Sequence, residues 1–181
     1  MPDKSYERII FPLDLPTLEA ALKYVEQLRG SVGLFKIGLE LFISAGPGAV
    51  EAVKRAAPEC GIFLDLKLHD IPATVTGAMS TALALGVEFV TVHCDDGGPI
   101  LRAAVEAAAS GTEGGNSLGV LGVTVLTSMS TEAMVEAGID SNKFPTPFDL
   151  VLHRAKVARE AGCAGVICSP LEASAVKEAN G

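Results

Sequence analysis

The sequence GIFLDLKLHDIPATV, residues 61–75, carries the strongest information about fold and chemistry. Residues 62–68 are mostly apolar, as expected of a buried strand, but Asp65 and Lys67 interrupt them. Successive strand side chains point to opposite faces, so these two charges share one face. Three leucines share the other face: Leu64, Leu66 and Leu68. Buried charges are costly unless they are paired, so an Asp65–Lys67 pair is expected.

Asp70 and Pro72 follow this strand directly. Pro72 suits the first turn of a helix, and Asp70 is placed to cap it. Strand ends that face a helix start are where α/β folds place their chemistry. A buried Asp–Lys pair can be purely structural. Three charged residues at one strand tip, followed by Ile-Pro, favour a functional site.

Composition restricts the class of protein. A chain of 181 residues fits one domain with a sizeable core. The net charge of −8 argues against a nucleic-acid-binding surface. No apolar run reaches the ~18 residues of a membrane span, and the polar start MPDKSYER does not resemble a signal peptide. Four cysteines without C-x-x-C spacing and only three histidines indicate reduced thiols in a cytoplasmic protein, with no zinc site.

Strands and helices alternate along the whole chain. The expected strands cover residues 9–13, 34–39, 62–68, 89–93, 118–126 and 165–168, and helices begin near residues 16, 47, 72, 100, 131, 147 and 171. This rhythm predicts right-handed βαβ units and a parallel sheet. A glycine-rich loop over 111–115 precedes the fifth strand, in which Gly119 and Gly122 predict close packing.

Two architectures fit this pattern, an open doubly wound sheet and a (β/α)8 barrel. No G-x-G-x-x-G follows the first strand, which weakens the dinucleotide-binding version of the open sheet. Charged residues at the carboxyl ends of the first four strands suit a barrel, in which every strand end faces one central pocket. A (β/α)8 barrel takes at least ~200 residues, and only six βα units are visible in this sequence, so both architectures stay open at this point.

The motifs resemble those of the bacterial branch of the orotidine 5′-phosphate decarboxylase family. The stretch FLDLKLHDIPAT, residues 63–74, is similar to the D-x-K-x-x-D-I-P-x-T motif of that family. Further stretches match in order: FPLD (11–14), FKIGLEL (35–41), VTVHCDDGG (90–98), GVTVLTSM (122–129) and GVICSPLEA (165–173). The resemblance implies a single (β/α) TIM barrel domain over residues 1–181, with about six βα units present. It also implies cofactor-independent decarboxylation of orotidine 5′-phosphate to uridine 5′-phosphate and carbon dioxide in pyrimidine biosynthesis.

The chain departs from the family pattern at its end. Family members continue through two more βα units, which bring a glutamine and a P-G-I-R loop that grips the phosphate. This sequence stops at Gly181, before either of them. We therefore expect a truncated or incompletely represented chain that lacks the last two βα units. For such a chain, an inactive fragment that dimerises or binds nucleotide weakly is an alternative reading.

The resemblance also implies catalytic roles. Decarboxylation leaves a carbanion on the pyrimidine ring, so the protein needs preorganised charge and an acid at that carbon. Lys67 is the expected proton donor. Asp65 is expected beside the departing carboxylate, where it also holds Lys67. With Lys36 and Asp70, these residues form an alternating network that keeps each lysine charged.

Substrate-binding roles are implied for further residues. Asp14 and Lys36 are expected to reach the ribose hydroxyls, and Thr127 the pyrimidine. Asp70, Ile71 and Thr74 are expected to reach across a homodimer interface into the partner's site. No metal ion, nucleic acid or membrane is expected to take part.

Other readings concern the same residues. Metal-dependent sugar-phosphate decarboxylases and hexulose-phosphate synthases of the same superfamily carry an acidic metal ligand where this chain has Lys36. His93 is either a hydrogen-bonding residue behind the site or a packed core histidine. Cys94 and Cys168 are expected in the core or pocket wall, because neither has an obvious base partner. Asp95 and Asp96 suit a solvated loop or a helix cap better than a metal site.

Overall fold

The computed structural model describes residues 5–111 and 118–180. Its centre is one sheet whose six strands lie side by side in chain order. The strands are β1 (Ile10–Pro12), β2 (Leu34–Gly38), β3 (Gly61–Leu68), β4 (Phe89–His93), β5 (Gly119–Val123) and β6 (Gly165–Ile167). Every neighbouring pair is parallel, which confirms the prediction from the strand–helix rhythm.

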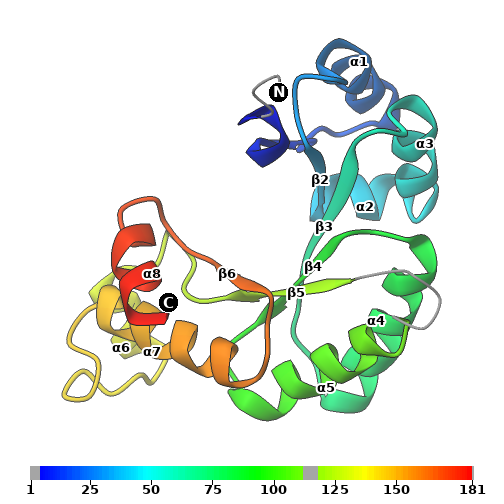
Figure 1. Ribbon diagram of the computed structural model, residues 1–181. Helices are drawn as coiled ribbons and strands as arrows, with labels where there is room; N and C mark the ends of the chain where they lie inside the picture. Colours follow the sequence, from blue (N-terminus) through cyan, green and yellow to red (C-terminus); the bar gives the residue numbers. More distant parts are fainter. Residues whose placement is uncertain (1–4, 112–117, 181) are drawn as a thin grey trace.

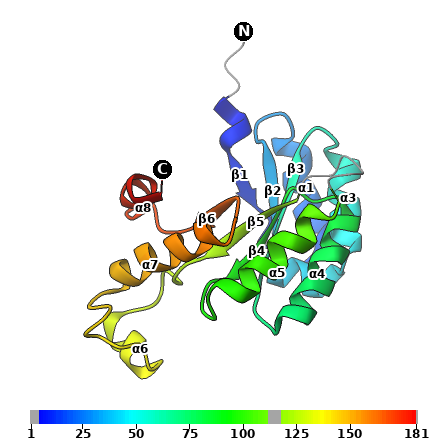
Figure 2. The same cartoon turned by 60° about the horizontal axis from the view of Figure 1, so that its bottom comes forward.

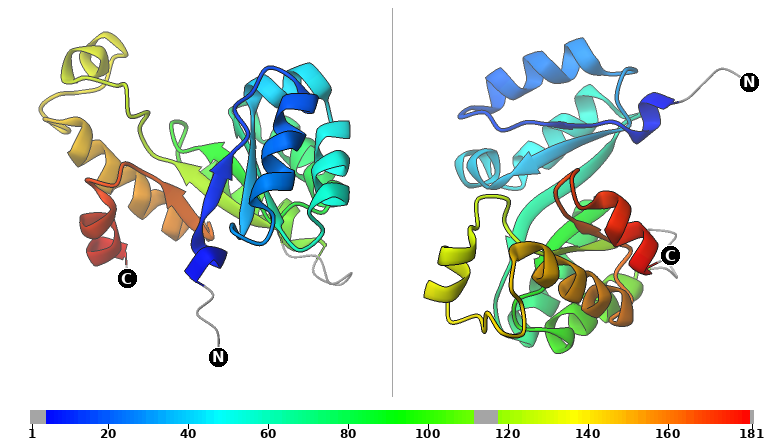
Figure 3. Two further views of the ribbon diagram at one scale, coloured as in Figure 1. Left: turned by 90° about the horizontal axis from the view of Figure 1, so that it is seen from above. Right: turned by 90° about the vertical axis from the view of Figure 1, so that its left-hand side faces the viewer.

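The sheet curls like part of a barrel wall, with β1 and β6 at the two ends of the curl (Figures 1 and 3). Helices α3, α4 and α5 cover its convex side (Figures 1 and 2). A doubly wound sheet would reverse its strand order at a switch point. The sequential order found here confirms the barrel type, with six βα units in the described ranges.

Nine helical segments connect and flank these strands in the described part of the chain. They are the 3₁₀ helix η1 (Ser5–Arg8) and the α-helices α1 (Leu18–Leu28), α2 (Leu39–Ala45), α3 (Gly48–Ala56), α4 (Pro72–Leu85), α5 (Gly98–Ala109), α6 (Thr131–Glu136), α7 (Pro147–Glu160) and α8 (Ala173–Asn180). None of the helices in the described ranges combines the length and apolar character needed to cross a membrane.

The main core lies between the sheet and helices α1 to α5. Strand β2 shows how the sequence divides its two faces. Phe35 and Ile37 are fully buried in this core, whereas Lys36 between them points to the opposite, inner face of the sheet. A second, smaller core joins α6, α7 and α8 through residues such as Met134, Val151 and Val176.

Several helix ends follow the predicted signals. Thr17 caps α1, because its Oγ1 accepts a hydrogen bond from the amide of Ala20 at 3.2 Å. Pro72 occupies the first position of α4, and Gly86 ends that helix with a φ of 65°. Asp70 does not cap α4. The N-cap is Ile71, whose amide donates to Asp70 Oδ1 at 2.7 Å.

Other boundaries differ from the sequence predictions. Helix α2 was not expected, because no element was predicted between the strand over 34–39 and the helix that begins near Pro47. Gly46 separates α2 from α3 with a φ of 61°, a conformation that favours glycine. Strand β5 is shorter than the predicted 118–126, because its pairing with β6 ends at Val123. Of the glycine-rich loop predicted over 111–115, residues 112–115 lie outside the described residues.

The two glycines of β5 allow close packing, as predicted. A Cβ atom on Gly122 would lie 2.8 Å from Cys94 Sγ and 3.0 Å from Ala158 Cβ on α7. A Cβ atom on Gly119 would lie 2.6 Å from the Phe89 ring. Helix α7 therefore approaches the sheet more closely than any side chain at position 122 would allow.

Candidate active site

Charged side chains from β1, β2 and β3 meet on the inner face of the curled sheet. Asp14 follows β1, Lys36 lies in β2, and Asp65 and Lys67 lie in β3. The leucines that alternate with the β3 charges turn the other way, where Leu64, Leu66 and Leu68 line an apolar cavity against α4. The predicted division of the two faces of β3 is thus present in the structure.

The four side chains form a row of alternating charge. Lys36 Nζ lies 3.0 Å from Asp14 Oδ1 and 3.3 Å from Asp65 Oδ2. Lys67 Nζ lies 2.9 Å from each carboxylate oxygen of Asp65. Asp65 therefore holds two ammonium groups at once. We refer to Asp14, Lys36, Asp65 and Lys67 as the charged row.

Burial and charge act in opposite directions on Asp65. Its residue is only 8% exposed, and burial alone would raise the pKa of its carboxyl. The hydrogen bond and charge of Lys67, followed by the charge of Lys36, outweigh this effect and hold the pKa below its ordinary value. Asp65 is therefore ionised at neutral pH, and it can hold both lysines in place.

Strand β3 bulges where these charges lie. Leu64 pairs with Val90 and Leu68 with Val92, so three residues of β3 stand opposite the single residue Thr91 of β4. Within this bulge Lys67 has a φ of 50°, and no other non-glycine residue in the described ranges has a positive φ. The bulge aims the Lys67 side chain and interrupts regular pairing between Leu64 and Leu68.

Two residues that support the charged row were not predicted. Thr91 is fully buried and donates to Asp65 Oδ1 at 3.0 Å, but its sequence position looks like an ordinary strand threonine. Gly38 leaves space for the row, since a Cβ atom there would lie 2.6 Å from Asp14 Oδ1 and 3.3 Å from Lys36 Nζ. From the sequence, Gly38 looks only like a glycine that ends a strand.

Asp70 lies outside the charged row in this chain. It was predicted as a fourth member of the network with Lys36, Asp65 and Lys67, but its carboxylate accepts from the Ile71 amide instead. Asp70, Lys67 and Thr74 do line one hollow of about 260 Å³. Ile71 is 66% exposed, and Thr127 is exposed in the turn after β5.

A second polar cluster surrounds the tip of β4. Asp95 Oδ1 lies 2.5 Å from Arg154 Nη1 of α7, and Asp95 Oδ2 lies 3.1 Å from His93 Nδ1. The His93 contact lacks the alignment of a hydrogen bond. Asp96 Oδ2 lies 2.5 Å from His69 Nε2, and the His69 and His93 rings are 5.2 Å apart. Arg154 also donates to the carbonyl oxygen of Thr124 at 2.7 Å.

This cluster bears on two predictions, one for His93 and one for Asp95 and Asp96. Burial lowers the pKa of His93, as do the charges of His69, Arg154 and Lys67, while Asp95 opposes them. His93 is thus a partly buried, neutral ring behind the site. Asp95 and Asp96 are exposed residues of the loop after β4, as one of the two predicted alternatives has it, and neither caps a helix, because Gly97 is the N-cap of α5. No group of three or more potential metal ligands gathers in the described ranges.

The cysteines are poor nucleophiles in this structure. Burial raises the pKa of Cys94 to about 12 and that of Cys163 to about 11. Burial also raises the pKa of Cys168. A thiol with so high a pKa carries almost no thiolate at neutral pH. The assignment of Cys94 and Cys168 to the core or pocket wall agrees with this.

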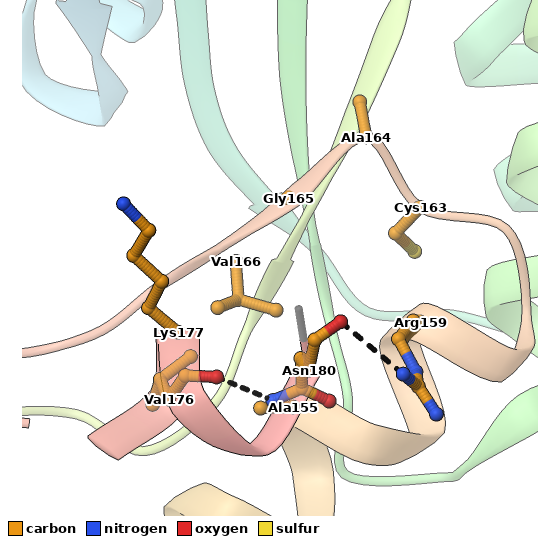
Figure 4. A pocket seen from close by; sticks show the side chains of 9 residues that line it. All are labelled: Ala155, Arg159, Cys163, Ala164, Gly165, Val166, Val176, Lys177 and Asn180. Atoms are coloured by element: carbon orange, nitrogen blue, oxygen red, sulfur yellow. Dashed lines mark hydrogen bonds between the residues drawn. The ribbon is translucent and has the colours of Figure 1, made fainter. Parts of the chain in front are cut away.

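A separate cavity of about 250 Å³ lies between β6, α7 and α8 (Figure 4). In it, Arg159 Nη1 donates to the main-chain oxygen of Asn180 at 3.2 Å, and Asn180 Nδ2 donates to the carbonyl of Val176 at 2.8 Å. The residues that line it in Figure 4 include no member of the charged row. The cavity is therefore distinct from the candidate site.

Comparison with known proteins identifies the family. Residues 7–181 match the family described as orotidine 5′-phosphate decarboxylase / HUMPS family. The chain is 46% identical over 170 residues to "Orotidine 5′-phosphate decarboxylase" of Desulfosudis oleivorans, covering 94% of this chain and 66% of that protein. It is 43% identical over 178 residues to the protein of the same name from Anaeromyxobacter sp. (strain K), covering 98% and 73%.

The fold gives the same result. The crystal structure of orotidine 5′-phosphate decarboxylase from Lactobacillus acidophilus superposes with a TM-score of 0.83 at 36% identity, covering 94% of this chain and 75% of that one. The chain thus spans about two thirds to three quarters of the length of these relatives. With the family match extending over nearly all its residues, the chain belongs to the orotidine 5′-phosphate decarboxylase / HUMPS family.

Proposed function

We propose that this protein decarboxylates orotidine 5′-phosphate to uridine 5′-phosphate and carbon dioxide, a step of pyrimidine biosynthesis. Family membership and the names of its relatives support the reaction. The observation that carries the proposal is the charged row, in which the Lys67 ammonium is held on the carboxylate of Asp65. Such preorganised charge is what a carbanion-like transition state requires.

The chemistry needs one bond broken and one formed. The bond between the pyrimidine ring carbon and the carboxylate breaks, carbon dioxide leaves, and the electron pair remains on the ring carbon. The Lys67 ammonium stabilises this negative charge and then gives a proton to the carbon, which forms the C–H bond of the product. Water returns a proton to the amine before the next turnover.

The other members of the row orient the reactants. Asp65 fixes the Lys67 ammonium and lies beside the leaving carboxylate, whose departure relieves the contact between two anions. Lys36 lies between Asp14 and Asp65, at 3.0 and 3.3 Å, and so fixes the distance between them. Asp14, whose side chain is 57% exposed, accepts hydrogen bonds from the ribose hydroxyls with the help of Lys36. Thr127 contacts the pyrimidine from the turn that follows β5.

The active unit in this proposal is a homodimer in the cytoplasm. Asp70, Ile71 and Thr74 would reach into the partner's site. In support, these residues project from the start of α4 and are exposed in the single chain, and Ile71 presents a large apolar side chain to solvent. Asp70 would then extend the partner's row of alternating charge.

A decarboxylation assay tests the proposal directly. Purified protein is mixed with orotidine 5′-phosphate, and the loss of substrate absorbance and release of carbon dioxide are followed with and without EDTA. We expect turnover that EDTA does not change. Turnover lost with EDTA and restored by Mg²⁺ would instead indicate a metal-dependent relative, and so would turnover of a sugar phosphate but not of orotidine 5′-phosphate.

A further inference from the structure

Thr91 lies directly behind the charged row, in the middle of β4. It is fully buried, and its hydroxyl makes two hydrogen bonds to β3. The Oγ1 atom accepts from the backbone amide of Lys67 at 2.8 Å and donates to Asp65 Oδ1 at 3.0 Å. A hydroxyl has one proton to donate, and here the carboxylate receives it.

The first of these bonds replaces a bond that the sheet cannot make. Regular pairing between β3 and β4 is interrupted between Leu64 and Leu68, so the Lys67 amide lies in the bulge. A buried amide without a partner would destabilise this conformation. The Thr91 hydroxyl supplies that partner, and so it stabilises the bulge itself.

The backbone at Lys67 needs such support. Its φ of 50° is unfavourable for a residue with a side chain. Conformations of this kind persist only where surrounding contacts hold them. The same hydroxyl binds Asp65, which in turn holds the Lys67 ammonium at 2.9 Å. One side chain therefore fixes both the backbone and, through Asp65, the amine of Lys67.

We propose that Thr91 is a positioning residue for decarboxylation, whose hydroxyl holds the β3 bulge and Asp65 so that the Lys67 amine meets the reacting carbon. The inference rests on the proposed function for its kinetic consequence. Its structural content, the dependence of the Lys67 conformation on the Thr91 hydroxyl, stands apart from the substrate.

Thr91→Val tests the inference, because valine keeps the shape and removes the hydroxyl. We expect kcat to fall about 10- to 100-fold, since small misplacements of a reacting group carry penalties of this size. KM should change by less than about twofold, because the substrate contacts remain. Thr91→Ser, which keeps the hydroxyl, should recover kcat to within about threefold of wild type.

Thr124 provides a matched control. It is also fully buried, directly after β5, and its hydroxyl donates to the carbonyl of Ile167 in β6 at 2.8 Å rather than to a member of the charged row. Thr124→Val should leave kcat far closer to wild type than Thr91→Val does. Equal losses in the two variants would overturn the inference, and so would a folded Thr91→Val protein with unchanged kcat or a Thr91→Ser protein as impaired as Thr91→Val.

Crystal structures separate this inference from the proposed function. In Thr91→Val, Lys67 should leave its positive φ and its amine should move away from Asp65. If wild type fails to decarboxylate orotidine 5′-phosphate, the proposed function fails, but this structural result still decides the inference. An unchanged Lys67 conformation would overturn it. If Thr91→Val does not fold, Thr91→Cys, a weaker hydrogen-bonding group of similar size, takes its place in the same comparisons.

Discussion

The ammonium of Lys67 lies 2.9 Å from both carboxylate oxygens of Asp65, which precedes it by two residues in the same strand. In a regular strand, residues two apart are separated by about 6.6 Å along the chain. The bulge in β3 and the bend of the lysine side chain bring the two groups together. The amine is thus held by its own strand, while Lys36 approaches the same carboxylate from β2.

Replacing Lys67 tests its assignment as proton donor. Lys67→Ala should reduce the decarboxylation rate by about 10³-fold or more, because both the acid and the charge beside the reacting carbon are lost. The steady-state rate with orotidine 5′-phosphate is the measurement, and circular dichroism should show an unchanged fold. Lys23→Ala is the matched control, since Lys23 is an exposed lysine paired with Glu19 on the surface of α1. Near-normal turnover of Lys67→Ala would remove the proton-donor role.

Asp65 makes a pH-dependent contribution to stability. Its pKa in the folded protein is below the ordinary value of 3.8, because Lys67 and Lys36 outweigh the effect of burial. Its contribution is therefore fully present above pH 3.8 and is lost as pH falls through the lowered pKa. Asp65→Asn should reduce the free energy of unfolding by about 1–3 kcal/mol at pH 7, since two lysines lose their shared partner.

Urea denaturation at a series of pH values measures this effect. The difference between wild type and Asp65→Asn should shrink as the pH is lowered below 3.8. Glu160→Gln serves as a control, because Glu160 is exposed and lies 3.9 Å from Lys156, and such surface pairs contribute little. A difference that stays constant from neutral to acid pH would show that the charge of Asp65 is not what stabilises the row.

Gly38 should tolerate no side chain. In Gly38→Ala, the new Cβ atom would lie 2.6 Å from Asp14 Oδ1, so the Asp14 carboxylate must move away from Lys36. With Asp14 assigned to the ribose, KM should rise more than kcat falls. Gly48→Ala on α3 is the control, because a Cβ atom there meets nothing within 4 Å. Gly38→Ala with wild-type KM would argue against a role for Asp14 in binding.

Mixing two inactive variants tests the shared site. If Asp70 acts in the partner's site, a heterodimer of Lys67→Ala and Asp70→Ala contains one site with both residues intact. Unfolding and refolding an equal mixture should then restore about a quarter of wild-type activity, since half of the dimers are mixed and each has one intact site. Each variant refolded alone is the control. No recovery in mixed dimers verified by mass spectrometry would place Asp70 in its own chain's site.

The sequence is most informative where periodicity and charge coincide. Alternating apolar and charged residues predicted which face of β3 holds Asp65 and Lys67, and the same reasoning placed Lys36 on the inner face of β2. The six strands and their parallel order also followed from the strand–helix rhythm. These features depend on local spacing, which a sequence records directly.

Features that depend on the meeting of distant segments could not be predicted. Nothing in the D-x-K spacing indicates that β3 bulges there, because the bulge arises from pairing with β4. Thr91 and Arg154 acquire their roles only when the fold brings them to Asp65 and Asp95. Gly38 likewise matters because of Asp14, a residue on the neighbouring strand tip.

The absence of a side chain at Gly122 connects the packing of α7 on the sheet with the polar cluster at the tip of β4. Because position 122 has no side chain, α7 packs directly against β5. From α7, the Arg154 guanidinium contacts the carbonyl oxygen of Thr124 and the carboxylate of Asp95. The added Cβ atom of Gly122→Ala would push α7 away from the sheet and weaken the contacts of Arg154 with Thr124 and Asp95. Substitutions at the buried contact between α7 and β5 should therefore alter the spacing of the carboxyl ends of β4 and β5.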